Sequence, residues 1–307
     1  MIPSWPKLMG VLNITPNSFS DGGLYSSLEN CTKKMAEILS SEANYLDVGA
    51  ESTAPFNKPC TEEIEKKRVE DILIPSLLQL SLRDDCSDFF SGGTLSLDTY
   101  RPEIFSFVVR QLSPRFPHLK FLWNDVSGII DEKTLTVLRE NPESDYVYCH
   151  NLAPTREQTS FHKDFVASGG LTDFLDHLKA YFQRGLDFFK GHGLQERVYF
   201  DPCFGFSKTL KHNEYLLKNL PVLIDHFPKE MKWVIGVSKK SFLREAIKER
   251  RSSSQDWEAV EFLHTGFLSL WFAQLREHKL VMRVHNPNVF HGALKAHAMM
   301  DSLIGSK

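Results

Sequence analysis

The sequence predicts an α/β fold of the (β/α)8 TIM-barrel type, and two observations predict it. Short apolar runs alternate with longer amphipathic segments eight times along the 307 residues. Polar side chains stand at the end of almost every apolar run. Eight parallel strands close into a barrel whose carboxyl ends share one mouth, so these polar residues would converge there. The length suits one barrel domain covering residues 1–307.

The strands are predicted from short apolar runs bounded by polar and turn residues. The first run, GVLN, leads into the polar loop ITPNSFSDGG, whose two glycines let the backbone turn. A long polar loop on a buried strand is how α/β enzymes build sites. The predicted strands cover residues 7–13, 44–49, 94–98, 119–124, 145–150, 197–201, 232–237 and 279–285.

Segments with helical spacing fill the intervals between the strands. Thr61 is followed by two glutamates, as at a helix N-terminus, and Pro102 stands in the first turn of the third helix. Residues 151–169 have no clear period and are predicted to form a loop. The predicted helices cover residues 28–41, 61–82, 102–112, 131–140, 170–190, 211–226, 240–276 with a break near 252–254, and 287–304.

Composition excludes several classes of protein. With 42% hydrophobic and 24% charged residues the chain is an ordinary globular protein, and a net charge of -3 gives no field to hold nucleic acid or an acidic membrane. No apolar run approaches a membrane span, and the N-terminus lacks a secretory signal. Five cysteines without close pairs or metal-ligand spacing fit reduced thiols. We therefore expect a cytoplasmic protein.

An open doubly wound sheet is the main competing fold. It would be favoured by a GxGxxG fingerprint after the first strand, and none is present. In the barrel, many polar strand ends would meet at one mouth, although any one of them could be a cap or turn residue, as Asp47 or Asn124 with Asp125 could. The candidates are Asn13, Asp47, Asp98, Asn124, His150, Asp201, Ser238, Lys239, Lys240, Arg283 and His285.

The residue types suggest a flat, amino-substituted heterocycle as the ligand. Asp98, Asn124 and Asp201 offer mixed donors and acceptors, and a carboxylate can accept two parallel N–H bonds. Lys240 could bond a ring carbonyl, and Arg283 could stack on the ring face. Alternatively, Asn13, Arg283 and His285 could face an anion such as phosphate, with Mg²⁺ bound to the amide oxygen of Asn13.

Seven motifs in order along almost the whole chain resemble those of the dihydropteroate synthase family. They are GVLNITPNSFSDGG, LDVGAEST with Pro55, SLDTYRPE, NDVSG, DPCFGFSKT with Asn213, GVSKKSF and MRVHN. The resemblance implies a barrel enzyme of folate biosynthesis. It would condense 7,8-dihydropterin-6-ylmethyl diphosphate with 4-aminobenzoate, with Mg²⁺ as cofactor, to give 7,8-dihydropteroate and pyrophosphate. It also implies a homodimer formed through helices near the end of the barrel, where residues 257–273 are rich in apolar side chains.

The resemblance also implies roles for individual residues. Asp98, Asn124, Asp201 and Lys240 would hold the pterin with Arg283 against its face, and Asn13, Arg283 and His285 would hold the diphosphate, Asn13 together with Mg²⁺. The residues that would act in catalysis are Asp98, Lys240, Arg283 and His285. Those that would border the aminobenzoate pocket are Phe19, Thr53, Pro55, Phe206, Lys240 and Ser241.

The chain departs from the family pattern at several motif positions. Ala54 stands where the family usually has an arginine that helps to clamp the diphosphate, and Lys58 in the same loop could substitute for it. Cys203 replaces the glycine after Asp-Pro, which demands a backbone angle that a side chain accepts. The other departures are Lys239 for arginine, Asn286 for aspartate, and His150-Asn151-Leu152-Ala153-Pro154 for a His-Met followed by a glycine-containing turn.

Two functions remain open from the sequence, with a third less well matched. The chain is either an active, divergent dihydropteroate synthase or a pterin-binding homologue with weak or no synthase activity. A barrel that transfers a methyl group from a reduced folate would also bind a pterin. The LNITPNSFSDGG and SKKSF motifs resemble the synthase far more closely.

Overall fold

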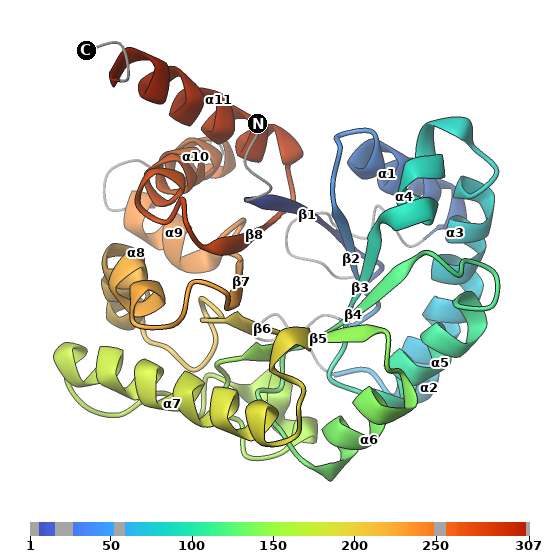
Figure 1. Ribbon diagram of the computed structural model, residues 1–307, viewed down its shortest axis with the longest axis horizontal. Helices are drawn as coiled ribbons and strands as arrows, with labels where there is room; N and C mark the ends of the chain where they lie inside the picture. The colour runs from blue at the N-terminus through green and yellow to red at the C-terminus, as the bar shows by residue number, and fades with distance from the viewer. Residues whose placement is uncertain (1–5, 16–26, 52–58, 249–255, 305–307) are drawn as a thin grey trace.

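The computed structural model describes residues 6–15, 27–51, 59–248 and 256–304. Its eight parallel strands form a closed barrel in sequence order, and helices surround it (Figure 1). The predicted TIM barrel is confirmed, with each strand within two residues of its predicted position. The strands are β1 (Lys7–Asn13), β2 (Tyr45–Gly49), β3 (Thr94–Asp98), β4 (Lys120–Asp125), β5 (Ser144–Cys149), β6 (Val198–Asp201), β7 (Lys232–Ile235) and β8 (Lys279–Val284).

The helices that the sequence predicts are also present, and several begin at side-chain caps. Thr61 accepts a hydrogen bond from the Ile64 amide, and Asp131 and Thr209 cap α6 and α8 in the same way. The helices are α1 (Leu28–Leu39), α2 (Glu62–Arg68), α3 (Ile74–Leu80), α4 (Ser87–Gly92), α5 (Pro102–Leu112), α6 (Glu132–Glu140), α7 (Leu171–Gly191), α8 (Leu210–Asp225), α9 (Ser241–Lys248), α10 (Asp256–Gln274) and α11 (Pro287–Ile304).

Three local details differ from the prediction. The single helix expected at residues 61–82 contains a π-helical turn, η1 (Val69–Leu73), because Pro75 has no amide hydrogen to continue the ladder. The short η2 (Asp84–Cys86) and α4 before β3 were not predicted, because three and six residues are too few to show a repeated apolar period. The predicted loop at 151–169 contains the 3-10 helix η3 (Arg156–Phe161). The predicted break near 252–254 lies outside the described residues.

Side chains that point into the barrel form the floor beneath its mouth. They alternate along the strands, as the period of two requires, and form one buried cluster. The hydroxyls of Tyr45 and Tyr199 meet across the barrel at 3.0 Å. The strand residues of this inner cluster are Met9, Tyr45, Leu122, Val147, Cys149, Tyr199, Val234 and Val281.

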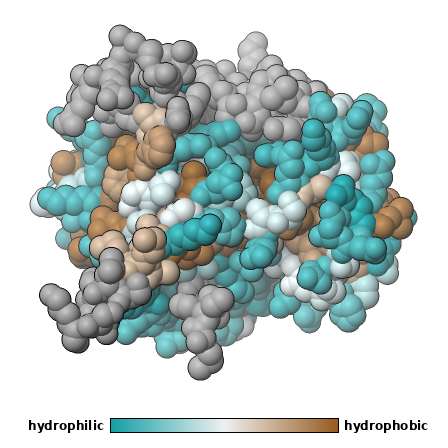
Figure 2. Space-filling view, turned by 90° about the horizontal axis from the view of Figure 1, so that it is seen from above, coloured by the Kyte–Doolittle hydropathy of each residue, from teal (hydrophilic) through white to brown (hydrophobic). Residues whose placement is uncertain are grey.

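A second, larger core fills the space between the strands and the outer helices. Trp123 of β4 stacks on Phe105 of α5, and Trp233 of β7 meets Phe182 of α7 edge to face. All four side chains are fully buried. No helix in the described part of the chain is long and apolar enough to cross a bilayer. Hydrophilic and hydrophobic residues are interspersed on the face shown in Figure 2.

Candidate active site

Polar side chains occupy the inward positions directly above the apolar floor of the barrel. Asp47, Asn124 and Arg283 each follow a floor residue of the same strand by two positions, so each points to the same interior. Asp98 pairs in register with Gly49 and with Asn124 on the two neighbouring strands. The alternation that builds the core therefore also builds a ring of polar groups at the carboxyl ends of the strands.

Arg283 is the centre of this ring. Its Nε donates to Asp47 Oδ2 at 2.7 Å, and one terminal nitrogen donates to Asp98 Oδ2 at 2.6 Å. Gly236, directly after β7, lies beside it, and a Cβ there would make ordinary van der Waals contact at 3.5 Å with the Cβ and Cδ of Arg283. The two carboxylates thus fix the plane of the guanidinium at the mouth.

Asp47 is a site residue to which the sequence analysis assigned no role. It is fully buried, and its Oδ1 accepts hydrogen bonds from Ser96 Oγ at 2.5 Å and Asn124 Nδ2 at 3.2 Å. Asp47 therefore orients both Arg283 and Asn124. The signal available in the sequence was an aspartate in the middle of the apolar run YLDVG, where a charge is costly unless it is paired.

The side-chain oxygen of Asn124 is a hydrogen-bond acceptor for which the described residues supply no donor. Its amide nitrogen is used by Asp47, whereas its Oδ1 is buried and has no hydrogen-bond partner among the described residues. A buried acceptor without a donor costs free energy, on the order of 1–3 kcal/mol. A ligand with an N–H edge would remove that cost.

Arg283 is bonded to two carboxylates, Asp47 and Asp98, and these charges shift the pKa values of Arg283 and Asp98. Burial raises the pKa of Asp98 to about 7, although Arg283 opposes the shift, and the nearby Asp47 adds to it. The pKa of Arg283 is raised by Asp47 and Asp98, so the guanidinium stays charged. Asp98 is the group in this cluster that can gain or lose a proton near neutral pH.

Asp201 and Lys240 lie on the next part of the mouth. Asp201 Oδ1 accepts the Cys203 amide at 2.6 Å, and burial raises the pKa of this carboxyl while Lys240 opposes the shift. Burial lowers the pKa of Lys240, whose ammonium lies 4.9 Å from the centre of the Phe206 ring. Asp201, Lys240 and Phe206, predicted as ligand contacts, are therefore close together.

Cys203 adopts a left-handed backbone conformation with φ of 53°. The expectation that this position takes an angle acceptable to a side chain is therefore wrong, because the cysteine keeps the conformation that favours glycine. Its amide bond to Asp201 supports the turn. Lys239, in the turn after β7, also has a positive φ of 53°.

His285 is held at the end of β8 by Ser238. The backbone N–H and the ring Nδ1 of His285 both lie 3.2 Å from Ser238 Oγ. Burial, followed by the charges of Lys239 and Arg283, lowers the pKa of the imidazole well below its ordinary value. The ring is therefore neutral at pH 7 and can donate one N–H.

Asn13 ends β1 next to Gly49, the last residue of β2. A Cβ added to Gly49 would lie 3.2 Å from Asn13 Oδ1 and 3.5 Å from Asp98 Cβ. The missing side chain leaves a cradle next to an amide oxygen and near a carboxylate. Hard cations such as Mg²⁺ take oxygen ligands and often bind through one or two protein groups plus substrate phosphates, so this donor set fits such an ion.

Some predicted residues cannot be placed in the site. Phe19, Thr53 and Pro55, together with Ala54 and Lys58, lie outside the described residues. Ser241 begins α9, and the structure does not describe its side chain.

His150 lies at a strand end but does not face the mouth with the inward residues. It is fully buried, and its ring nitrogens lie 3.1 Å from His177 Nε2 of α7 and 2.8 Å from Lys208 Nζ. Lys208 also donates to the carbonyls of Cys203 and Phe206 at 3.1 and 2.9 Å. Burial lowers its pKa to about 8. This lysine was part of the DPCFGFSKT motif but had received no role; it holds the turn after β6.

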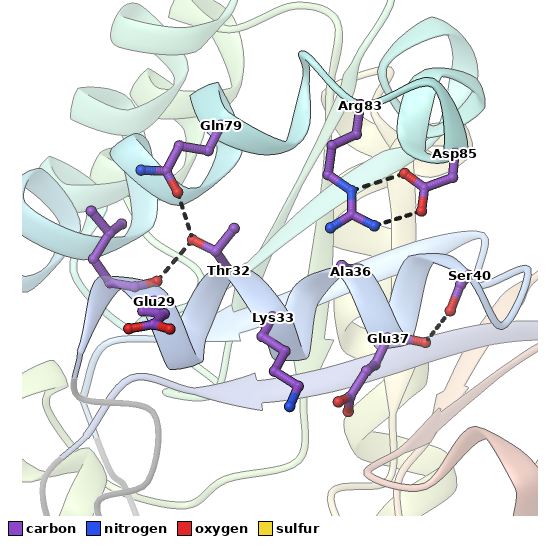
Figure 3. A pocket seen from close by; sticks show the side chains of 10 residues that line it. Glu29, Thr32, Lys33, Ala36, Glu37, Ser40, Gln79, Arg83 and Asp85 are labelled. Carbon is purple, nitrogen blue, oxygen red and sulfur yellow. Dashed lines mark hydrogen bonds and ion pairs between the residues drawn. The ribbon is translucent and has the colours of Figure 1, made fainter.

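A groove of about 680 Å³ lies outside the barrel, between α1 and α3 (Figure 3). Several of its polar side chains are already paired: Arg83 Nε and a terminal nitrogen donate to Asp85 at 2.9 and 2.6 Å, and the Thr32 hydroxyl donates to the Leu28 carbonyl at 2.8 Å. The groove shares no residue with the ring at the mouth, and we assign it no function.

Comparison with known proteins agrees with this arrangement. The family model described as pterin binding enzyme matches residues 9–269. Dihydropteroate synthase of Neisseria meningitidis serogroup C is 30% identical over 294 residues, which cover 95% of this chain and 91% of that protein. Dihydropteroate synthase of Escherichia coli K12 is 29% identical over 78% of this chain and 75% of its own length.

Solved structures share the fold. Dihydropteroate synthase of Yersinia pestis, solved in complex with a sulfonamide drug, superposes with a TM-score of 0.74 at 22% identity and covers 100% of this chain and 97% of its own. The Xanthomonas albilineans enzyme, solved with 4-aminobenzoic acid, gives a TM-score of 0.69 at 22% identity over 98% of this chain and 93% of its own.

Proposed function

This chain belongs to the pterin-binding enzyme family, and we propose that it is a dihydropteroate synthase. It would condense 7,8-dihydropterin-6-ylmethyl diphosphate with 4-aminobenzoate and release pyrophosphate. Both substrates are small molecules of the cytoplasm, where the five unpaired thiols would also stay reduced. The observation that carries the proposal is the buried Asn124 Oδ1, which has no partner within the described part of the chain and lies beside the Asp47, Asp98 and Arg283 network.

The ring of polar groups suits the pterin. Its amino and ring N–H groups can donate to Asn124 Oδ1 and to the carboxylates of Asp98 and Asp201, and its carbonyl can accept from Lys240. Arg283, whose plane is fixed by Asp47 and Asp98, can lie against the ring face. Binding would thus satisfy an acceptor for which the described residues supply no donor.

The other side of the mouth suits the diphosphate. His285, neutral because its pKa is lowered, can donate an N–H to a leaving oxygen, and Arg283 and Lys240 contribute positive charge. Bound Mg²⁺ would supply further charge neutralisation of the diphosphate, with Asn13 as its protein ligand.

The proposed condensation requires little proton transfer by side chains of the protein. Loss of diphosphate leaves an electron-poor methylene carbon, and a carboxylate at Asp98 can stabilise positive charge that develops on the ring. The amine of 4-aminobenzoate is neutral at pH 7 and can attack without a strong general base. The main tasks of these residues are therefore orientation and charge stabilisation.

Ala54 favours a second candidate function, a pterin-binding homologue with weak or no synthase activity. Losing one preorganised charge typically costs on the order of 2–4 kcal/mol of transition-state stabilisation. Such a loss would slow the reaction without removing the pterin contacts, because Ala54 belongs to a different loop from Asn124, Asp201 and Lys240.

Complementation of a bacterial strain that lacks this folate step tests the proposal. We expect the chain to restore growth without folate end products, and the Asp201→Asn variant to restore it poorly. If the chain fails although the protein accumulates, while Ala54→Arg restores growth, the second function is correct. If purified protein binds no pterin at all, both are wrong.

A further inference from the structure

Two cysteines and one of the predicted pterin contacts form a compact group at the barrel mouth. The sulfur atoms of Cys149 and Cys203 and a carboxylate oxygen of Asp201 all lie within 4.8 Å of one another. The three residues are 0%, 4% and 7% exposed. Cys149 and Cys203 are far apart in the sequence, and the fold brings their sulfur atoms together.

The fold brings these residues together through neighbouring strands. Cys149 ends β5 and pairs in register with Asp201, which ends β6. Both occupy inward positions, two residues beyond Val147 and Tyr199 of the barrel floor. The left-handed conformation of Cys203 and its amide bond to Asp201 place the second thiol in the same inner cluster.

We propose that Cys149, Cys203 and Asp201 bind a thiophilic divalent cation of the zinc class. Zinc takes thiolate and carboxylate ligands at about 2.0–2.3 Å, which puts tetrahedral ligand atoms roughly 3.3–3.8 Å apart. The three ligand atoms, which lie within 4.8 Å of one another, would draw together to this spacing around the ion. Three protein ligands leave the fourth position open to water or to a ligand in the mouth.

The surrounding charges suit such a complex. Two thiolates and a carboxylate with a divalent ion carry one net negative charge, and the cations that act on Asp201 include Lys240 and Lys208. Lys208 is held against this turn by its bond to the Cys203 carbonyl at 3.1 Å. In the empty protein, burial raises the pKa of Cys149 well above its ordinary value. Metal binding therefore has to displace the proton of the Cys149 thiol, which passes to solvent.

Metal binding would block the pterin contact of Asp201. This consequence rests on the proposed function, whereas the metal site itself does not. A bound cation would engage the carboxylate and fill space between β5 and β6, so the cation and a pterin should compete. The proposed Mg²⁺ site at Asn13 is separate, because it offers only oxygen ligands at the end of β1.

Titration with Cd²⁺ alone tests the site in the full-length protein after reduction and removal of metals with a chelator. We expect one Cd²⁺ per chain, with the ultraviolet charge-transfer absorption of cadmium bound to thiolates. Cys149→Ser and Cys203→Gly should each lower that absorption to about half or less, because one thiolate is lost, and weaken Cd²⁺ binding at least about tenfold. Glycine accepts the backbone conformation of Cys203, so this variant should keep its fold.

Cys86→Ser is the matched control, because the Cys86 thiol also contacts a carboxylate, Asp85 Oδ1 at 3.7 Å, in the outer layer. It should leave Cd²⁺ binding unchanged. Absence of thiolate absorption in the unmodified protein, or unchanged binding in Cys203→Gly, would overturn the proposal.

Competition is then measured with 6-hydroxymethylpterin, which lacks a diphosphate to chelate the metal. Saturating Cd²⁺ should weaken its binding at least about tenfold in the unmodified protein, following loss of a hydrogen-bonded charged partner, and leave it unchanged in Cys203→Gly. Pterin binding that Cd²⁺ does not weaken would contradict the competition. A protein that binds Cd²⁺ as expected but no pterin would refute the proposed function and leave the metal site intact.

Discussion

Asp201 has two roles: it holds a turn of the backbone, and it is predicted to bind the pterin. Its Oδ1 holds the turn after β6 through the Cys203 amide, and the carboxylate is predicted to accept N–H groups of the pterin. An asparagine keeps an oxygen for the turn but loses charge and one acceptor. We therefore expect Asp201→Asn to weaken pterin binding by ~1.5–3 kcal/mol, or about 10-fold to 100-fold.

Calorimetric titration of the variant with the pterin diphosphate measures this effect. Asp145→Asn is a matched control, since Asp145 lies near the start of the neighbouring strand β5, at the opposite end from the mouth. The control should bind as the unmodified protein does. Equal affinity for Asp201→Asn would contradict the role of this carboxylate.

Asp98 should make stability depend on pH. Burial raises its pKa from 3.8 to about 7, so between these values the folded protein holds a proton that the unfolded chain has lost. The free energy of unfolding should therefore fall as pH rises through this window, by at most ~4 kcal/mol from this group. Asp98→Asn cannot ionise, and its unfolding should lack this part of the pH dependence. Denaturant unfolding from pH 4 to pH 8 measures it; an identical slope in both proteins would refute the assignment.

Single residues also mark the limit of what the sequence could predict at the site. Asn124, Asp201 and Lys240 were predicted from their places at strand ends, and the structure brings them to one mouth. Asp47 gained its role only in three dimensions, because its partner Arg283 lies 236 residues away in the sequence. His150 faces α7, and no pattern in the nearby sequence predicts this orientation, because it depends on the contact with His177.

At the scale of elements, a buried ion cluster ties the end of β2 to α2 and α5. Arg101 bonds Glu51 and Glu65 together, and its other terminal nitrogen donates to the Cys60 carbonyl at 2.6 Å. Burial raises the pKa of Glu65, which Arg101 opposes. Removal of the arginine would leave two buried carboxylates without their cation.

We expect Arg101→Met to lower the free energy of unfolding by about 3–5 kcal/mol. Denaturant unfolding measures this, with Arg83→Met as the control, since Arg83 pairs with Asp85 in an equally close but exposed ion pair. The control should change stability far less. Equal effects of both substitutions would show that the cluster contributes nothing beyond a surface pair.

Elements themselves were largely predictable, because strand and helix periods differ clearly in this chain. All eight strands and the long helices follow the alternation of apolar residues. The misses are short or irregular. The π turn at Val69–Leu73 depends on the amide that Pro75 lacks, and η3 at Arg156–Phe161 has no apolar period of its own. Arg156, buried and bonded to Asp125 at 2.5 Å, anchors η3 through a contact distant in sequence.

At the scale of the whole molecule, α10 and α11 carry exposed apolar side chains where the family resemblance implies a homodimer interface. Val260, Leu268 and Trp271 pack on the barrel, whereas Phe262 and Leu270 are 72% and 50% exposed. These two lie eight residues apart on one helical face. Helix α11, which packs beside α10 (Figure 1), adds the exposed Met299 and Met300.

We expect a dimer by sedimentation, and a monomer for the double variant Phe262→Glu, Leu270→Glu, because charges would be buried at the interface. Leu82→Glu is the control, since Leu82 is 86% exposed after α3, away from these helices. It should remain dimeric. A monomeric unmodified protein, or a double variant that stays dimeric, would place the interface elsewhere or remove it.

The most direct test of the central claim is turnover by the purified protein with the pterin diphosphate, 4-aminobenzoate and Mg²⁺. We expect 7,8-dihydropteroate and pyrophosphate in equal amounts, with faster turnover in Ala54→Arg because the variant gains a charge for the leaving group. Binding of the pterin diphosphate without product, in both the unmodified protein and Ala54→Arg, would contradict the assignment of this barrel as a dihydropteroate synthase.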